Sequence, residues 1–225
     1  MNINIINSVE QAHLARWIAV VIDVFRAFST EAYIMNNGAK YIIPVMSLEE
    51  AFELRNKNPN CVLVWERQWI KPEWFDYGNS PTELEHINLA NKVVIHTTTN
   101  GTVWLINTKN AEIVITWSFV NAWAIIKYIR QSALETVSLI STAPQNEENE
   151  DLILARYIQD VLLNKEIDCW QITEMIRKTS VFQYLFNEIW VPKSDFDLCL
   201  DINKFDFVIQ QAYMWSQCIL KRINV

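Results

Sequence analysis

Charged side chains stand at the ends of apolar segments, where they could bind a phosphorylated ligand. Asp23 and Arg26 lie at the end of the apolar run Ile18–Val24, and Glu66-Arg67 follows the apolar run Cys61–Trp65. Glu150-Asp151 stands at the start of the helix expected over 151–163. Carboxylates bind divalent cations and a guanidinium clamps oxyanions, so these pairs fit a metal-assisted anion site. On spacing alone, the first two pairs are equally well explained as structural ion pairs, and the third as favourable charge at a helix N-terminus.

Two small, polar loops could bind the oxyanion itself. These loops are Gly78-Asn-Ser-Pro81 and Thr97-Thr-Thr-Asn-Gly-Thr102. Threonine hydroxyls and free backbone N–H groups at a strand-to-helix turn suit a phosphate, whereas Asn-Gly also favours an ordinary turn. Ser118 and Asn121 could add hydrogen bonds, although Asn121 could instead cap a helix. The histidines lack metal-ligand spacing, and His96, within an expected strand, is expected in the core.

The elements that position these groups alternate along the chain. Short β-branched runs read as buried strands, amphipathic segments between them read as helices, and Ser47-Leu-Glu-Glu50 is a capping box. This alternation indicates an α/β fold with a mostly parallel or mixed sheet, in which ligands bind beyond the carboxyl ends of strands. The expected strands are Ile18–Val24, Tyr41–Val45, Cys61–Trp65, Lys92–His96, Glu112–Thr116 and Thr136–Ile140, with short ones near Asp197–Leu200 and Phe205–Ile209; the expected helices are 29–37, 47–57, 121–131, 151–163 and 172–186.

Composition narrows the class of protein. The 225 residues carry a net charge of −7 and 51% hydrophobic residues, so we expect one compact domain over 1–225 and no nucleic-acid partner. Four widely spaced cysteines, no signal-peptide pattern and no apolar run long enough for a bilayer predict a reduced, cytoplasmic protein without membrane contact. The oligomeric state stays open, and a homo-oligomer is compatible with the sequence.

Taken together, the segments resemble the 2-phosphosulfolactate phosphatase family. The matching stretches occur in order over most of the chain to about residue 165, and the segment 195–208 matches more loosely. They are Val20–Ala27, Asn37–Lys40, Ile43–Val45, Glu49–Phe52, Glu66-Arg67, Lys71-Pro72, Phe75–Pro81, Thr97–Thr102, Ser118-Phe119, Asn121-Ala122 and Glu150-Asp151. Each motif is weak by itself, but the ordered set is specific.

The resemblance implies a three-layer α/β/α fold, a Mg²⁺ requirement and hydrolysis of the phosphate monoester of a small acidic 2-hydroxy acid. Asp23, Glu66 and Arg26 become the catalytic candidates, and Asp23, Glu150 and Asp151 the metal candidates. The candidates for binding the small anionic phosphorylated substrate are Arg67, Asn79, Ser80, Thr98, Thr99, Asn100, Gly101, Thr102, Ser118 and Asn121.

Tryptophan stands where this family has glycine. The chain has three glycines and ten tryptophans, whereas average usage would give roughly sixteen glycines. The family pattern around Glu66 has Trp65 and Trp69 in place of two glycines. Either the loops are truly remodelled, or UGA codons meant for glycine are read as tryptophan. Core aromatic packing explains isolated cases such as Trp215, but not Trp65 and Trp69 around a single Glu-Arg pair.

Three functions therefore stay open. The first is the phosphatase. The second is a catalytically impaired family member that binds an anion or a protein partner, its pocket blocked by Trp65, Trp69 and Trp117. The third is an unrelated α/β transferase that uses the threonine loop for a nucleotide phosphate.

Overall fold

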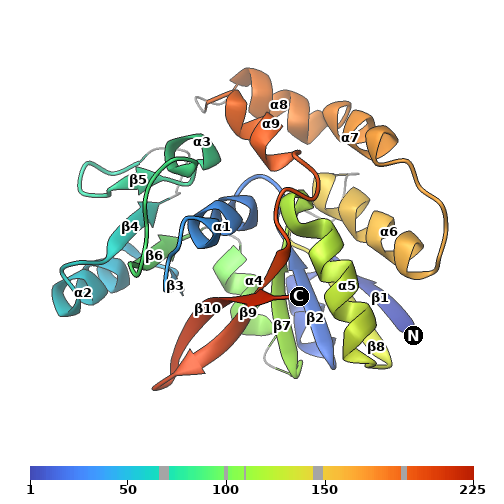
Figure 1. Cartoon of the computed structure of the whole chain (residues 1–225), viewed down its shortest axis with the longest axis horizontal. Helices are drawn as coiled ribbons and strands as arrows, with labels where there is room; N and C mark the ends of the chain where they lie inside the picture. Colours follow the sequence, from blue (N-terminus) through green and yellow to red (C-terminus); the bar gives the residue numbers. More distant parts are fainter. Residues whose placement is uncertain (66–70, 99–100, 109, 144–148, 189–191) are drawn as a thin grey trace.

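The computed structural model describes residues 1–65, 71–98, 101–108, 110–143, 149–188 and 192–225. A ten-stranded sheet has the order β1-β8-β2-β7-β9-β10-β3-β6-β4-β5 (Figure 1). Its strands are β1 (Asn2–Ile6), β2 (Ile18–Ile22), β3 (Tyr41–Val45), β4 (Val62–Trp65), β5 (Tyr77–Gly78), β6 (Val93–Thr97), β7 (Ile113–Trp117), β8 (Thr136–Ser141), β9 (Phe207–Met214) and β10 (Gln217–Asn224).

The sheet is mixed, as the sequence predicts. β1, β8, β2 and β7 form one parallel block, and β3, β6, β4 and β5 form a second. The antiparallel hairpin β9–β10 lies between the two blocks, where β9 pairs with β7 and β10 pairs with β3. A hairpin from the end of the chain therefore joins two parallel blocks built earlier in the sequence.

Helices cover both faces of the sheet, in agreement with the α/β fold class. They are α1 (Ala27–Asn36), α2 (Leu48–Lys57), α3 (Pro81–Leu84), α4 (Gly101–Asn107), α5 (Ala122–Ser132), α6 (Glu150–Leu162), α7 (Cys169–Arg177), α8 (Ser180–Glu188) and α9 (Ser194–Cys199), with short 3₁₀ turns η1 (Val9–Leu14) and η2 (Phe119–Asn121). In Figure 1, α7, α8 and α9 lie across the top of the view, and the hairpin β9–β10 lies at the bottom.

Strand β2 shows why the layers form. Every residue of Ile18–Ile22 is fully buried. Ile18, Val20 and Ile22 pack in a hydrophobic core with side chains of α5 and α6. Ala19 and Val21 pack on the opposite face with side chains of α1 and α4. Because alternate side chains of a strand point to opposite faces, an unbroken apolar strand must be covered on both sides.

Local signals place several helix ends where the sequence predicts them. The Ser47 hydroxyl accepts a hydrogen bond from the backbone N–H of Glu50 at 3.1 Å, which fixes the start of α2. Gly38 follows α1 with a φ of +91°, a left-handed conformation that glycine adopts without steric cost. The Ser47 cap predicted for α2 is confirmed, and the Glu50 carboxylate accepts from the N–H of Met46 at 3.3 Å.

The C-terminal region differs from the expectation. Asp197–Leu200, expected as a strand, falls in and after helix α9, and the single helix expected over Ile172–Phe186 is two helices, α7 and α8. The strand expected at Phe205–Ile209 is β9, which begins at Phe207 and extends to Met214. Apolar residues at both spacings of two and three occur in this region, and tertiary burial of Phe196 and Cys199 selects the helix.

Two tryptophans have the backbone conformation of a glycine. The φ of Trp17 is 58° and that of Trp215 is 54°. Trp215 and Ser216, whose φ is 73°, form the two-residue turn of the β9–β10 hairpin. Two positive φ values define a type I′ turn, which favours glycine and asparagine and disfavours bulky residues. Trp215 is 94% exposed, so the expectation that it packs in a core is wrong.

We expect Trp215→Gly to raise the free energy of unfolding by about 1 kcal/mol, because it relieves the left-handed strain and removes no packing. Urea denaturation measures the change. The matched control is Trp123→Gly, since Trp123 is another exposed tryptophan but lies inside helix α5. Glycine there should lower stability by roughly 0.5 kcal/mol. Equal effects of the two substitutions would contradict a glycine requirement at Trp215.

Candidate active site

The turn after β2 fixes the carboxylate of Asp23. Its backbone N–H donates to the carbonyl of Trp117 at 3.1 Å, which continues the ladder between β2 and β7. Its side-chain Oδ1 accepts a hydrogen bond from the N–H of Ala27 at 3.1 Å, in the first turn of α1. Asp23 is buried and lies at the carboxyl end of a central parallel strand, where α/β sheets bind ligands.

The start of α6 brings a second pair of carboxylates to the same turn. Asn149 caps the helix by accepting from the N–H of Leu152 at 2.9 Å. Asp151 Oδ1 then accepts from the N–H of Val24 at 2.9 Å. Asp23 and Glu150 each directly precede one partner of this hydrogen bond, so the structure brings these three acidic residues onto adjoining segments.

The hydrogen bonds distinguish Asp151 from Glu150. Asp151 Oδ2 accepts from the hydroxyl of Thr142 at 2.9 Å, so both of its oxygens already bind groups of the chain. Glu150 is buried, and its Oε2 has no hydrogen-bond partner among the described residues. A carboxylate offers about four acceptor sites, and those of Asp151 are largely used. Glu150 is therefore better suited to bind an ion, and Asp151 to hold the turn.

Burial raises the pKa of both carboxyls. Desolvation is the largest cause for Glu150, and the neighbouring Asp151 charge raises its pKa further. Desolvation also raises the pKa of Asp151, although hydrogen bonds from Val24, Thr142 and Ala143 lower it in part. Two adjacent buried carboxylates raise the free energy of the folded protein, and a nearby positive ion would offset that cost.

Arg26 pairs with a carboxylate that the sequence analysis did not select. Its Nη1 donates to Oδ2 of Asp195, which lies in α9. Asp195 Oδ1 accepts from the Ser80 hydroxyl at 2.8 Å and from the N–H of Thr82 at 2.9 Å. Three segments far apart in the sequence, at Arg26, Ser80 and Asp195, therefore meet in one buried network. Asn79 is buried beside Ser80, and its N–H donates to the carbonyl of Trp65 at 3.0 Å.

The described part of the threonine loop lies beside the start of α1. The Thr98 hydroxyl accepts from the N–H of Thr102 at 3.1 Å and therefore caps α4. A Cβ at Gly101 would lie 3.0 Å from the ring of Phe28 and 3.1 Å from the Thr98 hydroxyl. Since Phe28 is in the first turn of α1, the loop is close to the Asp23 turn, and Gly101 allows this approach.

The Asn121 side chain binds backbone groups in this structure, whereas the buried Ser118 hydroxyl has no hydrogen-bond partner among the described residues. Asn121 Oδ1 accepts from the N–H of Ser118 at 3.4 Å, and its Nδ2 donates to the carbonyl of Phe207 at 3.2 Å. Asn121 occupies the N-cap position of α5, but its side chain makes no capping hydrogen bond to that helix. Ser118 stays close to Asp23, because the preceding residue pairs with Asp23.

Four of the predicted site residues, Glu66, Arg67, Thr99 and Asn100, lie outside the described residues. Within the described ranges, no three acidic, histidine or cysteine side chains are grouped so that they hold a metal ion by themselves. Mg²⁺ does not require such a cage, because it keeps several waters and binds through one or two carboxylates and substrate phosphates. Asp23 and Glu150, with its unsatisfied oxygen, fit that requirement.

His96 has the structural role expected from its place in a strand. It is fully buried in β6, and its Nδ1 lies 3.2 Å from Oε1 of Glu31 in α1. Its replacement by alanine would leave the Glu31 carboxyl buried without this partner. A His96 variant is therefore a poor neutral control for activity measurements.

Residues that sequence reasoning missed are Asp195 and Thr142. Asp195 was expected just before a strand, and its full burial depends on the docking of α9. Thr142 directly follows strand β8, in a segment that contributed no predicted site residue. A usable signal was its position directly after the predicted strand Thr136–Ile140, where side chains reach the carboxyl edge of the sheet.

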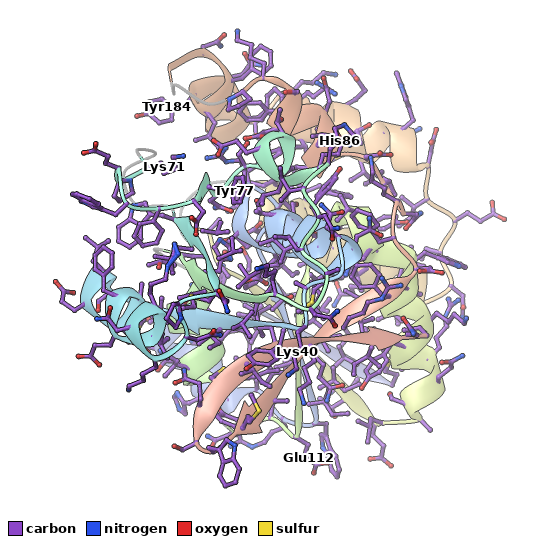
Figure 2. The ribbon with its side chains drawn as sticks, turned by 60° about the vertical axis from the view of Figure 1, so that its left-hand side comes forward. Lys40, Lys71, Tyr77, His86, Glu112 and Tyr184 are labelled. Carbon is purple, nitrogen blue, oxygen red and sulfur yellow. The ribbon has the colours of Figure 1, made fainter. Side chains whose placement is uncertain are left out.

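Helices α7, α8 and α9 lie over the carboxyl edge of the sheet (Figure 1). Figure 2 shows Tyr184 of α8 near the top of the view and Glu112, directly before β7, near the bottom.

A groove of about 730 Å³ between α6 and α7 contains none of the predicted site residues; its lining includes Ile153, Arg156, Tyr157, Glu166, Asp168 and Met175. None of the helices in the described ranges has the length and apolarity needed to cross a bilayer.

Comparisons with known proteins agree with this arrangement. The family model for 2-phosphosulpholactate phosphatase matches residues 3–213. A probable 2-phosphosulfolactate phosphatase of Thermoplasma acidophilum is 35% identical over 192 residues, which cover 85% of this chain and 84% of that protein. A protein of the same description from Clostridium perfringens strain SM101 is 37% identical over 176 residues, covering 76% and 70%. This chain therefore belongs to the 2-phosphosulfolactate phosphatase family, whose members are phosphoric monoester hydrolases.

Proposed function

We propose that the chain is a Mg²⁺-dependent phosphatase that hydrolyses the phosphate monoester of a small acidic 2-hydroxy acid, of which 2-phosphosulfolactate is the model. The observation that carries the proposal is the position of buried Asp23 and Glu150, each directly before one partner of the Val24–Asp151 hydrogen bond, with Arg26 three residues after Asp23. Family membership supports the reaction class more strongly than the individual substrate.

The charge balance of the site supports a metal requirement. Asp23, Glu150, Asp151 and Asp195 are buried carboxylates, and Arg26 is the one buried arginine or lysine among the described residues; it pairs with Asp195. A phosphorylated acid brings further negative charge to this surface. Mg²⁺ held by Asp23 and Glu150 would neutralise phosphoryl oxygens and lower the pKa of bound water.

The reaction adds water across the phosphate ester bond. The phosphorus–oxygen bond to the 2-hydroxy acid breaks, and the products are inorganic phosphate and the free hydroxy acid. Arg26 would hold an oxyanion of the substrate by charge-assisted hydrogen bonds. Asp23 would accept the proton of the attacking water in a site where Glu150 alone binds the cation. The hydroxyls of Thr98 and Thr102 would contact the remaining substrate oxygens.

We expect phosphate release from 2-phosphosulfolactate in the presence of Mg²⁺ and none after chelation with EDTA. A panel of 2-phosphohydroxy acids, measured by a colorimetric assay for inorganic phosphate, tests the substrate class. Because tryptophans stand at family glycine positions, the panel is measured on the chain as given and on a chain with those glycines restored. If neither chain turns over any substrate, the phosphatase function is rejected, and the anion-binding module is the remaining alternative.

A further inference from the structure

The carboxylate of Asp195 holds the Arg26 side chain. Asp195 has no exposed surface and accepts hydrogen bonds from Arg26, from the Ser80 hydroxyl at 2.8 Å and from the N–H of Thr82 at 2.9 Å. These donors belong to the turn after β2 and to the turn that begins α3. One side chain from the end of the chain therefore bridges the turns that lead out of the two parallel blocks.

Helix α9 is firmly attached around this carboxylate. The rings of Phe196 and Phe25 are in edge contact, with centroids 5.4 Å apart. The Tyr33 hydroxyl donates to the carbonyl of Leu198 at 3.0 Å. The hydroxyl of Ser194 lies 2.8 Å from that of Thr82. Contacts on both sides of Asp195 thus fix its position relative to α1 and α3.

A fixed carboxylate determines how a guanidinium can bind an anion. The guanidinium is planar and its five N–H donors point in fixed directions, so one strong charge-assisted bond at Nη1 sets the orientation of the group. We propose that Asp195 is a positioning residue that orients Arg26 toward an oxyanion of the substrate. This inference rests on the proposed function, because it assigns Arg26 to the anion bound at that site.

A positioning role for Asp195 predicts an effect on anion affinity that a purely structural role does not. If Asp195 acts through Arg26, then loss of the carboxylate weakens anion binding only while Arg26 is present. If Asp195 only joins α9 to the rest of the molecule, its loss lowers the melting temperature but leaves the anion affinity of the folded protein unchanged. A double-mutant cycle separates these roles.

The experiment measures the dissociation constant of inorganic phosphate by calorimetry with Mg²⁺ present, for the wild type, Asp195→Asn, Arg26→Gln and the double variant. We expect Asp195→Asn to raise the constant about tenfold. The double variant should be no weaker than Arg26→Gln alone. Asp197→Asn is the matched control, since Asp197 is in the same helix but is 72% exposed and pairs with Arg177. It should bind phosphate as the wild type does.

A second variant covers the case in which Asp195→Asn does not fold. Ser80→Ala removes one hydrogen bond to Asp195 and the cap that the Ser80 hydroxyl gives the N–H of Glu83 at 3.3 Å, and it leaves no buried charge unpaired. We expect about a threefold weaker affinity for phosphate. Additive effects in the cycle, or phosphate affinities unchanged in both Asp195→Asn and Ser80→Ala, would overturn the inference, as would a wild type that binds no phosphate.

The proposed function is judged separately, by turnover. Non-additive phosphate binding without turnover of any 2-phosphohydroxy acid would reject the phosphatase function and support the positioning role. Turnover together with additive binding effects would support the phosphatase function and reject the positioning role.

Discussion

Asp23→Asn is expected to slow Mg²⁺-dependent phosphate release by about 100-fold or more, whether Asp23 binds the metal or accepts a proton. The amide has the same shape and can still accept the hydrogen bond from the N–H of Ala27, so the fold should persist. Steady-state rates, together with a circular dichroism spectrum of the variant, make the measurement.

The control for this loss is Asp206→Asn. Asp206 is almost fully exposed and lies directly before β9, and its pair with Arg222 is long at 3.8 Å. Activity should be unchanged in this variant. If the folded Asp23→Asn protein retains wild-type turnover, Asp23 is not a catalytic or metal-binding residue.

Asp151→Ala is expected to lower the free energy of unfolding by about 3 kcal/mol, because the N–H of Val24 and the hydroxyl of Thr142 would lose a buried acceptor. The turn that carries Asp23 would lose its connection to α6, so activity should fall as well. Urea denaturation at constant Mg²⁺ measures the stability change.

Asp160→Ala is the comparison, since Asp160 is in the same helix and pairs with the exposed Lys165. A surface pair of this kind contributes at most about 1 kcal/mol. If the two alanine variants are equally stable, the hydrogen bonds of Asp151 do not organise the turn.

The parallel strands could be predicted because their signals are local. Runs such as Ile18–Val24 and Tyr41–Val45 are short, apolar and β-branched, and the structure has strands over Ile18–Ile22 and Tyr41–Val45. The alternation of these runs with amphipathic segments gave the α/β class and placed Asp23 and Glu150 near one edge. These patterns are reliable because a strand that is buried on both faces needs apolar residues at nearly every position.

The tail could not be predicted because its signals are long-range or hidden. A tight hairpin normally shows itself by Asn or Gly at the turn, and here the turn is Trp215-Ser216, so strand β10 was missed. Asp195 looks like any surface acid in the sequence. Its burial depends on Arg26 and Ser80, which are more than a hundred residues earlier in the chain.

The sequence also could not separate the neighbouring acids Glu150 and Asp151. Their order at the start of α6 fits either a metal site or a favourable helix terminus. The structure differentiates them by hydrogen bonding, since Asp151 is bound by the chain and Glu150 has an oxygen without a described partner. Such a difference depends on the exact rotation of the helix, which composition and spacing do not encode.

The most direct test of a divalent cation at the carboxyl edge of β2 is a calorimetric titration of Mg²⁺ into the wild type, Glu150→Gln and Glu112→Gln. Glu112 is an exposed acid at the opposite end of the sheet (Figure 2). We predict saturable binding that weakens at least about tenfold in Glu150→Gln and is unchanged in Glu112→Gln. Equal Mg²⁺ affinity in all three proteins, or no binding to the wild type, would contradict the metal site.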